Sequence, residues 1–168
     1  MSEKEDLIIR AATEDDTAVI LDFIRSLATY EKLLHEVSAD EEGLRKNLFE
    51  RQAAEVLLAE SMGSPAGFAL FFHNFSTFLG MPGIYIEDLF VHPEFRGRGI
   101  GARLLAAIAA LAVERGCGRL EWAVLDWNEP AMRFYRRLGA GSRDEWKLFR
   151  LTGSSLLELA GTTPLPGE

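Results

Sequence analysis

Cysteine is almost absent from the chain. Its 168 residues include one, Cys117, so no internal disulfide can form and we expect a reducing environment, the cytoplasm. Long apolar runs are also missing, because the longest, Leu104–Val113, is about half of the roughly 20 residues that span a bilayer. The first residues, MSEKEDLIIR, have no signal-peptide core. The sequence therefore predicts no membrane association.

Positive charge is in the minority. Lysine and arginine together number 18, against 26 aspartates and glutamates, and the formal net charge is -8. Nonspecific binding to nucleic acid needs a cationic surface, so we expect no nucleic-acid partner. An acidic balance is compatible with a small cationic substrate, although it often serves solubility alone. The histidines, His35, His73 and His92, show no metal-ligand spacing, and we expect no metal.

The hydrophobic pattern predicts one α/β domain, with a core over about residues 7–160 and a flexible tail over 161–168. Apolar runs predict strands over 7–12, 54–61, 66–75, 83–92, 119–127 and 146–151. Helices are predicted after Thr13, over 38–48, over 100–115, after Asn128 and near Leu156. Ser38 and Glu41 have the spacing of a capping box for the second of these helices. Strands come first in a block and then alternate with helices, which predicts a mixed sheet.

Arginine and glycine crowd together between Arg96 and Gly101, in the segment FRGRGIGARL that opens the helix at residue 100. Glycines let backbone N–H groups converge, a helix N-terminus attracts anions, and arginine forks onto phosphate oxygens. The segment therefore predicts a phosphate site, most simply for a pyrophosphate. A Walker loop is excluded, because Ala102 and Arg103 follow the last glycine where lysine and a hydroxyl residue would be needed.

Two other interpretations of this segment stay open. Gly97, Gly99 and Ala102 formally match the dinucleotide fingerprint G-x-G-x-x-G/A. Glu121 lies about 20 residues further on, where such sites place an acid for the ribose. The approach VHPEFRG is long for a tight turn, and one further strand–helix unit is too little for two nucleotide-binding halves. A glycine-rich surface loop is the plainer alternative.

Glu87 and Asp88 stand in the middle of the apolar strand GIYIEDLFVH. Regular alternation would place Ile84, Ile86, Asp88 and Phe90 on one face of the sheet and Glu87 on the other. A strand that is apolar on both faces is normally covered, and burying an unpaired carboxylate there is costly. These acids therefore either pair with a helix arginine or line a cleft, and the sequence leaves both possibilities open.

Tyr135 lies two turns into the helix that Asn128 caps, and periodicity alone favours an ordinary tyrosine at the core edge. The segment EDLFVHPEFRGRGIGARLL, however, is similar to the acetyl-CoA signature of the GNAT acetyltransferase superfamily, with Arg96, Gly99 and Gly101 in its R-x-x-G-x-G pattern. LDWNEPAMRFYRRLGA resembles the end of the same fold. With SLATYEKL and EWKLF, these segments look most like the diamine branch, which acetylates spermidine, spermine or thialysine. The resemblance covers about Leu7 to Ala160 and implies a GNAT-like fold, a central, mostly antiparallel twisted sheet flanked by helices.

The resemblance also implies a site. Tyr135 would be the general acid for the leaving thiolate, and Glu87 the base, acting through water. Cofactor contacts are implied for Leu89, Phe90, Val91, Arg96, Gly97, Arg98, Gly99, Ile100, Gly101, Ala102, Asn128, Glu129, Pro130, Ala131 and Tyr135. Amine contacts are implied for Tyr30, Glu31, Glu87, Asp88, Glu121, Trp122, Ala123 and Asp144. The branch usually has an acid-Gly-Trp segment where this chain has Asp144, Glu145 and Trp146, and Asp144 is chosen by register.

The resemblance thus implies a cytoplasmic homodimer that moves an acetyl group from acetyl-CoA to a primary amine of a small cationic substrate, a polyamine or a lysine-like molecule. An alkyl amine with a pKa of about 10.4 is neutral in roughly one molecule in 2,500 at pH 7, so a carboxylate base would help. Alternatives are a branch acting on aminoglycosides or protein N-termini, or a non-catalytic acyl-CoA-binding module. An acetyl-cysteine on Cys117 is disfavoured, because that residue follows the C-terminal end of a helix.

Overall fold

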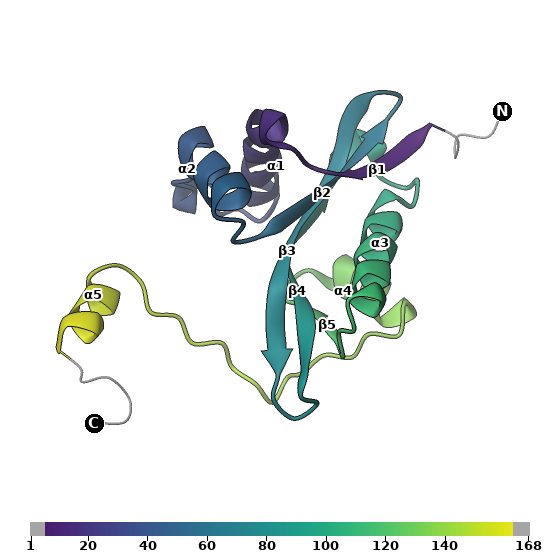
Figure 1. Cartoon of the computed structure of the whole chain (residues 1–168). Coiled ribbons are helices and arrows are strands. Elements are labelled where there is room, and N and C mark those ends of the chain that lie inside the picture. The colour runs from purple at the N-terminus through teal and green to yellow at the C-terminus, as the bar shows by residue number, and fades with distance from the viewer. Residues whose placement is uncertain (1–5, 163–168) are drawn as a thin grey trace. The chain divides into compact units, whose positions relative to one another are not determined.

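The computed structural model describes residues 6–162, which belong to two compact units, Met1–Ala123 and Val124–Glu168. The first unit contains a sheet with strands in the order β1-β2-β3-β4-β5 (Figure 1). Its strands are β1 (Leu7–Ala11), β2 (Glu55–Ser61), β3 (Ser64–Ser76), β4 (Met81–Val91) and β5 (Leu120–Trp122). The first four pair in antiparallel fashion and β5 pairs in parallel with β4, so the predicted mixed, mostly antiparallel sheet is confirmed.

Helices cover both faces of this sheet (Figure 1). In the first unit they are α1 (Thr17–Tyr30), α2 (Glu41–Arg45) and α3 (Ile100–Glu114), with 3-10 turns η1 (Glu14–Asp16), η2 (Leu34–Glu36) and η4 (Pro93–Phe95) and a π-helical turn η3 (Lys46–Glu50). The second unit holds α4 (Glu129–Arg137) and α5 (Gly153–Thr162). Within residues 6–162, no helix combines the length and apolarity that a membrane span requires.

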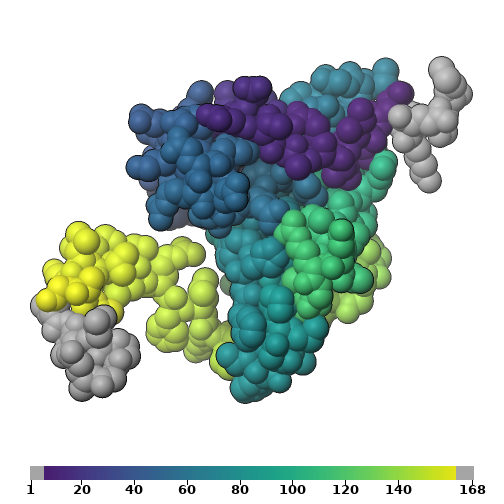
Figure 2. Space-filling model, in the orientation of Figure 1, coloured from purple at the N-terminus to yellow at the C-terminus, as the bar shows by residue number. Residues whose placement is uncertain are grey.

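One face of the sheet packs against α1 and α2, whose purple-to-blue atoms form one contiguous block in Figure 2. Buried residues of this core are Ile20, Phe23, Leu48, Val56, Leu58, Phe68 and Phe90. Phe23 and Phe68 are fully buried, and their rings stack with centroids 5.1 Å apart. The helical spacing that predicts α1 has its cause here, because Val19, Ile20, Phe23, Ile24 and Leu27 all belong to this core or pack against it.

The opposite face of the sheet packs against α3. Leu104, which is 0% exposed, approaches Gly67 of β3, where an added Cβ would lie 3.3 Å from the leucine Cδ1. Gly67 and Phe68 are neighbours on β3, so their side-chain positions lie on opposite faces. The predicted end of this helix is confirmed, since Gly116 follows it with a φ of 69°.

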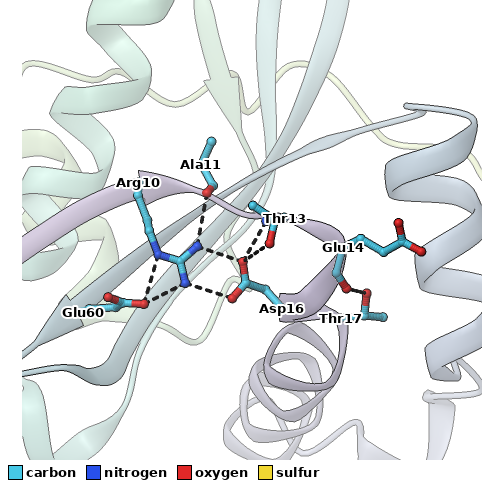
Figure 3. Close-up of polar contacts among 7 residues, drawn as sticks. All are labelled: Arg10, Ala11, Thr13, Glu14, Asp16, Thr17 and Glu60. Carbon is cyan, nitrogen blue, oxygen red and sulfur yellow. Dashed lines mark hydrogen bonds and ion pairs between the residues drawn. The ribbon is translucent and has the colours of Figure 1, made fainter.

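Arg10 ties the start of α1 to the sheet (Figure 3). Its guanidinium donates two hydrogen bonds to Asp16, at 2.8 and 2.9 Å, and two to Glu60 of β2, at 2.7 and 3.0 Å. Asp16 also accepts from the backbone N–H of Thr13 at 2.7 Å, and Thr13 is the predicted N-cap residue. Hydrogen bonds from the Arg10 side chain, and then from the Thr13 backbone, lower the pKa of Asp16 to about 2.

Two predicted element boundaries need correction. The second helix is capped by Asp40, which accepts from the N–H of Gly43 at 2.7 Å, and not by Ser38 with Glu41. Asp40 is the residue that still has an extended backbone directly before the helical turn, as an N-cap requires. The strand predicted over 119–127 is only Leu120–Trp122, because the chain turns where the N–H of Asn128 bonds to the carbonyl of Leu125.

The strand predicted over 146–151 is absent, since residues 140–152 form neither strand nor helix. Trp146, Leu148 and Phe149 are 76%, 81% and 90% exposed. A strand needs a partner for its backbone groups, and residues 124–162 include no other strand. Of the predicted tail, Gly161 and Thr162 belong to α5, and residues 163–168 lie outside the described residues. A single domain over 1–168 stays a prediction.

Candidate active site

The backbone conformation of the loop between β4 and α3 is suited to binding an anion. Gly97 and Gly99 have φ angles of 79° and 76°, in the left-handed region where a side chain is strained. Gly99 is the N-cap of α3, and the first turn of this helix carries no acidic residue. N–H groups of a first helical turn lack partners within the helix and attract anions. The segment Gly97–Ala102 is therefore suited to the phosphate oxygens that the sequence predicts there.

The two arginines of this loop differ in direction. Arg96 turns back toward the sheet, where its Nε donates to the carbonyl of Val91 at 3.0 Å and its guanidinium carbon lies 4.9 Å from the centroid of the Tyr30 ring. The guanidinium carbon of Arg98 lies 5.7 Å from the centroid of the Phe95 ring. Both arginine side chains are exposed, so each leaves N–H groups available to an anion at the loop.

A β-bulge divides β4 at Glu87. Phe71 of β3 pairs with Ile86, while the neighbouring Leu70 pairs with Asp88, so Glu87 is the extra residue. Residues paired across strands share a face, and Ile86 and Asp88 therefore lie on opposite faces of the sheet. The prediction that both lie on one face is wrong, because a bulge shifts the two-residue period. Asp88 instead shares the face of Leu70, which packs on the core beneath α1 and α2.

Carboxylates from α1 and β4 interact near this bulge. Burial, followed by the charges of Glu87 and Glu31, raises the pKa of Asp88 to about 7. Burial also raises the pKa of Glu31, which directly follows α1. Glu87 is exposed. Within residues 6–162, no lysine, arginine or histidine forms an ion pair with any of these acids, so the helix-arginine partner that the sequence left open is not found there.

Strand β5 accompanies β4 for only part of its length. Their parallel pairs run from Ile84 with Leu120 to Ile86 with Trp122. Beyond Ile86, the segment Leu89–Val91 pairs with β3 and with no other strand of residues 6–123. The second edge of this segment can therefore accept an extended ligand, as it would accept another strand.

Glu121 of β5 already has two partners in the first unit. Its Oε1 lies 2.8 Å from the Nε of Arg119 and accepts from the side-chain amide of Asn74 at 3.1 Å. Asn74 and Arg119 are not among the predicted site residues, although Gly83, a glycine within an apolar strand, is a signal for close approach of a neighbour. Asn74 occupies the space beside that glycine, since an added Cβ on Gly83 would lie 2.5 Å from its Oδ1. The next two residues after Glu121 are also predicted amine contacts. Trp122 is half-buried and Ala123 is exposed.

The remaining predicted site residues belong to the second unit. Asn128 caps α4 as predicted, with its Oδ1 accepting from the N–H of Ala131 at 3.4 Å, and Pro130 lies in the first turn. Tyr135 is half-buried on the same helix, with its ring centroid 5.4 Å from that of Phe134. Asp144 is exposed between α4 and α5. The functional roles of these residues stay predictions.

Other reactive side chains lie elsewhere in the first unit. Cys117 follows the C-terminal end of α3, as predicted from the sequence, and is half-buried. The ring of His92 stacks on Phe23 with centroids 4.5 Å apart. Across residues 6–162, no group of three or more histidine, cysteine, aspartate or glutamate side chains is arranged to hold a metal ion.

Known proteins match this chain over most of its length. Residues 20–140 match the acetyltransferase (GNAT) family. The chain is similar to thialysine N-epsilon-acetyltransferase of Bos taurus, with 41% identity over 167 residues, covering 92% of this chain and 98% of that protein. It is also similar to an L-ornithine N5-acetyltransferase of Arabidopsis thaliana, with 36% identity, covering 88% of this chain and 85% of that protein.

Solved structures share the fold. An integron cassette protein from V. cholerae matches with a TM-score of 0.78 and 27% identity, covering 94% of this chain and 99% of that one. An aminoglycoside acetyltransferase from an uncultured soil metagenomic sample matches with a TM-score of 0.77 and 22% identity, covering 91% and 100% of the two chains, a likeness of fold alone. Because the family match spans residues 20–140 and the bovine relative aligns over nearly its whole length, this chain belongs to the GNAT family and is an acetyltransferase.

Proposed function

We propose that this acetyltransferase moves the acetyl group of acetyl-CoA to a side-chain primary amine of a small, cationic, lysine-like substrate. The observation that carries the proposal is the group of Glu31, Glu87 and Asp88, whose charges interact and have no cationic partner among residues 6–162. The relatives support it, since those with 41% and 36% identity are named for thialysine and L-ornithine. A polyamine is the second candidate, because the same carboxylates suit any chain with two ammonium groups.

Acetyl-CoA is the co-substrate of GNAT enzymes, and the first unit offers groups suited to two of its parts. Backbone N–H groups of Gly97–Ala102, with the guanidinium groups of Arg96 and Arg98, would bind the pyrophosphate. Leu89–Val91, whose second edge β5 leaves unpaired, would bond the amides of the pantetheine arm as an added strand does. In the second unit, Asn128–Ala131 at the start of α4 would contact the cofactor.

The reaction removes two protons from the ammonium nitrogen of the substrate and adds one to the CoA sulfur. The amine must lose a proton before it attacks the thioester carbonyl, and Glu87 would accept that proton through a water molecule. Asp88 is the second candidate for this role, because a pKa of about 7 lets it exchange a proton near neutral pH. The new C–N bond forms as the C–S bond breaks. Tyr135 would protonate the leaving thiolate, and the second proton lost by the newly acetylated nitrogen would restore the Tyr135 hydroxyl. The products are the acetylated amine and free CoA thiol.

The proposed amine contacts differ in their support from the structure. Glu31 and Asp88 are the better-supported contacts, since each keeps its carboxylate free of an ion pair within residues 6–162. Glu121 has less negative charge to offer, because Arg119 already neutralises it. The resemblance to diamine acetyltransferases also implies amine contacts for Tyr30, Trp122, Ala123 and Asp144. A second ammonium group of the substrate would bind near Glu31 while the reacting amine meets the bulge of β4.

An amine panel tests the proposal. The protein and acetyl-CoA are offered thialysine, L-ornithine, spermidine, an aminoglycoside and a peptide with a free N-terminus, and release of CoA thiol is followed. We expect the lysine-like amines to give the highest kcat/KM, and neutral monoamines of equal length to react far more slowly. Fastest reaction of the aminoglycoside or the peptide would assign the chain to another acetyltransferase branch. Binding of CoA without turnover of any amine would favour a non-catalytic acyl-CoA-binding module, and heat with NAD but none with CoA would favour a dinucleotide.

We further propose a cytoplasmic homodimer. The apolar side chains of Trp146, Leu148 and Phe149 are 76%, 81% and 90% exposed in the second unit, and exposed apolar runs are typical of surfaces that another chain covers. The cytoplasmic location is supported by Cys117, which has no second cysteine to pair with. Sedimentation at micromolar concentration tests the dimer, and a species of monomer mass would contradict it.

A further inference from the structure

The guanidinium group of Arg96 is held from three directions. Its Nε donates to the carbonyl oxygen of Val91 at 3.0 Å. Its central carbon lies 4.9 Å from the ring centroid of Tyr30 and 5.4 Å from that of Phe90. The two rings tilt toward each other at 53°, with centroids 6.4 Å apart. A cation within about 6 Å of an aromatic face is attracted by the ring quadrupole, so both rings fix the direction of this side chain.

The outer end of the guanidinium is left free by this arrangement. Within residues 6–162, no acceptor is bonded to its two Nη groups, and the Arg96 side chain is exposed. Arginine presents its donors in a rigid fork, which matches phosphate oxygens once the side chain is oriented. Phe90 is buried in the core and cannot shift, whereas Tyr30 is the last residue of α1 and is 40% exposed. Tyr30 is therefore the outer support of the Arg96 fork.

This geometry changes the role expected of Tyr30. The resemblance to diamine acetyltransferases implies an amine contact there, but Arg96 already occupies a cation site on the ring. We propose that Tyr30 is a positioning residue of the cofactor site, which holds the Arg96 fork ready for the pyrophosphate of acetyl-CoA. This inference rests on the proposed use of acetyl-CoA and assigns Tyr30 to the cofactor rather than to the amine.

Calorimetric titration with CoA tests the inference without any turnover. Tyr30→Leu removes the ring and should raise the Kd for CoA about two- to fivefold, the loss expected for one exposed cation–π contact. Tyr30→Phe keeps the ring and should bind CoA as the unchanged protein does. Tyr30→Met repeats the test with an unbranched side chain, and melting curves confirm that each variant is folded. Because Tyr30 is 40% exposed, its replacement leaves no buried cavity.

A double-mutant cycle identifies Arg96 as the partner. In an Arg96→Ala background, Tyr30→Leu should have no further effect on CoA affinity. In an Arg98→Ala background, which serves as the matched control, the two- to fivefold loss should persist. The inference is overturned if Tyr30→Leu raises only the KM for the amine, or if its effect on CoA survives in Arg96→Ala. Absence of CoA binding by the unchanged protein would instead show that the proposed function itself is wrong, and this inference with it.

Discussion

The side chain of Asn74 on β3 donates a hydrogen bond to the carboxylate of Glu121 on β5 at 3.1 Å, although β4 lies between these two strands. The contact is possible because Asn74 pairs with Gly83 of β4, which has no side chain to stand in the way. Arg119 reaches the same carboxylate oxygen and bonds the backbone carbonyl of Phe75. This group of side chains joins the short strand β5 to the sheet where β5 pairs with β4.

Replacing Gly83, over which Asn74 reaches Glu121, should weaken the attachment of β5 to the sheet and lower the stability of the fold. In Gly83→Ala the new Cβ would lie 2.5 Å from Asn74 Oδ1 and 3.3 Å from the backbone oxygen of Arg119, so we expect a loss of about 1–3 kcal/mol of unfolding free energy. Adding Asn74→Ala should restore part of that loss. Gly141→Ala, whose Cβ would meet nothing within 4 Å, is the control in denaturant titrations. Equal stability of Gly83→Ala and the control would contradict the close approach of Asn74 and Arg119 to Gly83.

Acid should weaken the junction between β1 and α1. The folded state lowers the pKa of Asp16 from 3.8 to about 2, so its ionised form stabilises the fold above pH 3.8, and this contribution is lost as the pH falls toward 2. Asp16→Asn should cost about 1–2 kcal/mol at pH 7 and much less at pH 2. Urea titrations across this range measure the difference. Asp15→Asn, an exposed neighbour, should change little, and a loss for Asp16→Asn that does not depend on pH would argue against the ion pair.

Asp88 should destabilise the fold as the pH rises. Its pKa is about 7 in the folded protein against 3.8 for the ordinary side chain, so folding takes up a proton between these values and stability falls across that window. Asp88→Asn removes this dependence, and its melting temperature should exceed that of the unchanged protein by a margin that grows from pH 4 to pH 7 and then stays constant. Asp15→Asn, which alters an exposed acid that does not affect the pKa of Asp88, is the control. A constant margin at every pH would mean that Asp88 is not buried as described.

The two acids of the bulge should have separable effects on turnover. If Asp88 must lose its proton for reaction, kcat/KM should rise through an acidic limb centred near pH 7, and Asp88→Asn should move or abolish that limb. If Glu87 is the base, the substitution Glu87→Gln should lower kcat by a factor of about 10²–10⁴. Rate profiles from pH 5 to 10 test both. If Asp88→Asn leaves the acidic limb unchanged, that limb reports the ionisation of another group.

Tyr135→Phe should separate chemistry from binding. The phenylalanine keeps the ring beside Phe134 but has no hydroxyl proton to give the leaving thiolate. We expect kcat to fall by about 100-fold or more, with CoA affinity within about twofold of the unchanged protein. Stopped-flow release of thiol and calorimetry measure the two quantities. Full activity of this variant would remove Tyr135 from the mechanism.

Most elements of the first unit could be predicted because their causes are local. The spacing of Ile20, Phe23 and Leu27 reflects one buried helix face, and Gly116 ends α3 through its own backbone preference. The clustered glycines before Ile100 likewise predict the N-terminus of α3 and its affinity for anions.

Features that depend on a partner far along the chain could not be predicted. The apolar residues between Trp146 and Leu151 suit a strand, but composition does not reveal whether another strand lies beside them. The bulge at Glu87 depends on the register between β3 and β4, which a single strand does not encode. For the same reason the sequence did not identify Asn74 and Arg119 as the partners of Glu121, although Gly83 signals that some neighbour approaches β4 closely.

The bulge also separates what folding requires of β4 from what the proposed reaction would require of it. Losing the codon for Glu87 would keep the reading frame and would let Ile86 and Asp88 pair with Phe71 and Leu70 in an uninterrupted ladder. Every core residue of the strand would stay on its present face, because the surplus residue is the one removed. The hydrophobic core therefore gives no reason to retain this codon, whereas the proposed role of Glu87 as the base would supply one.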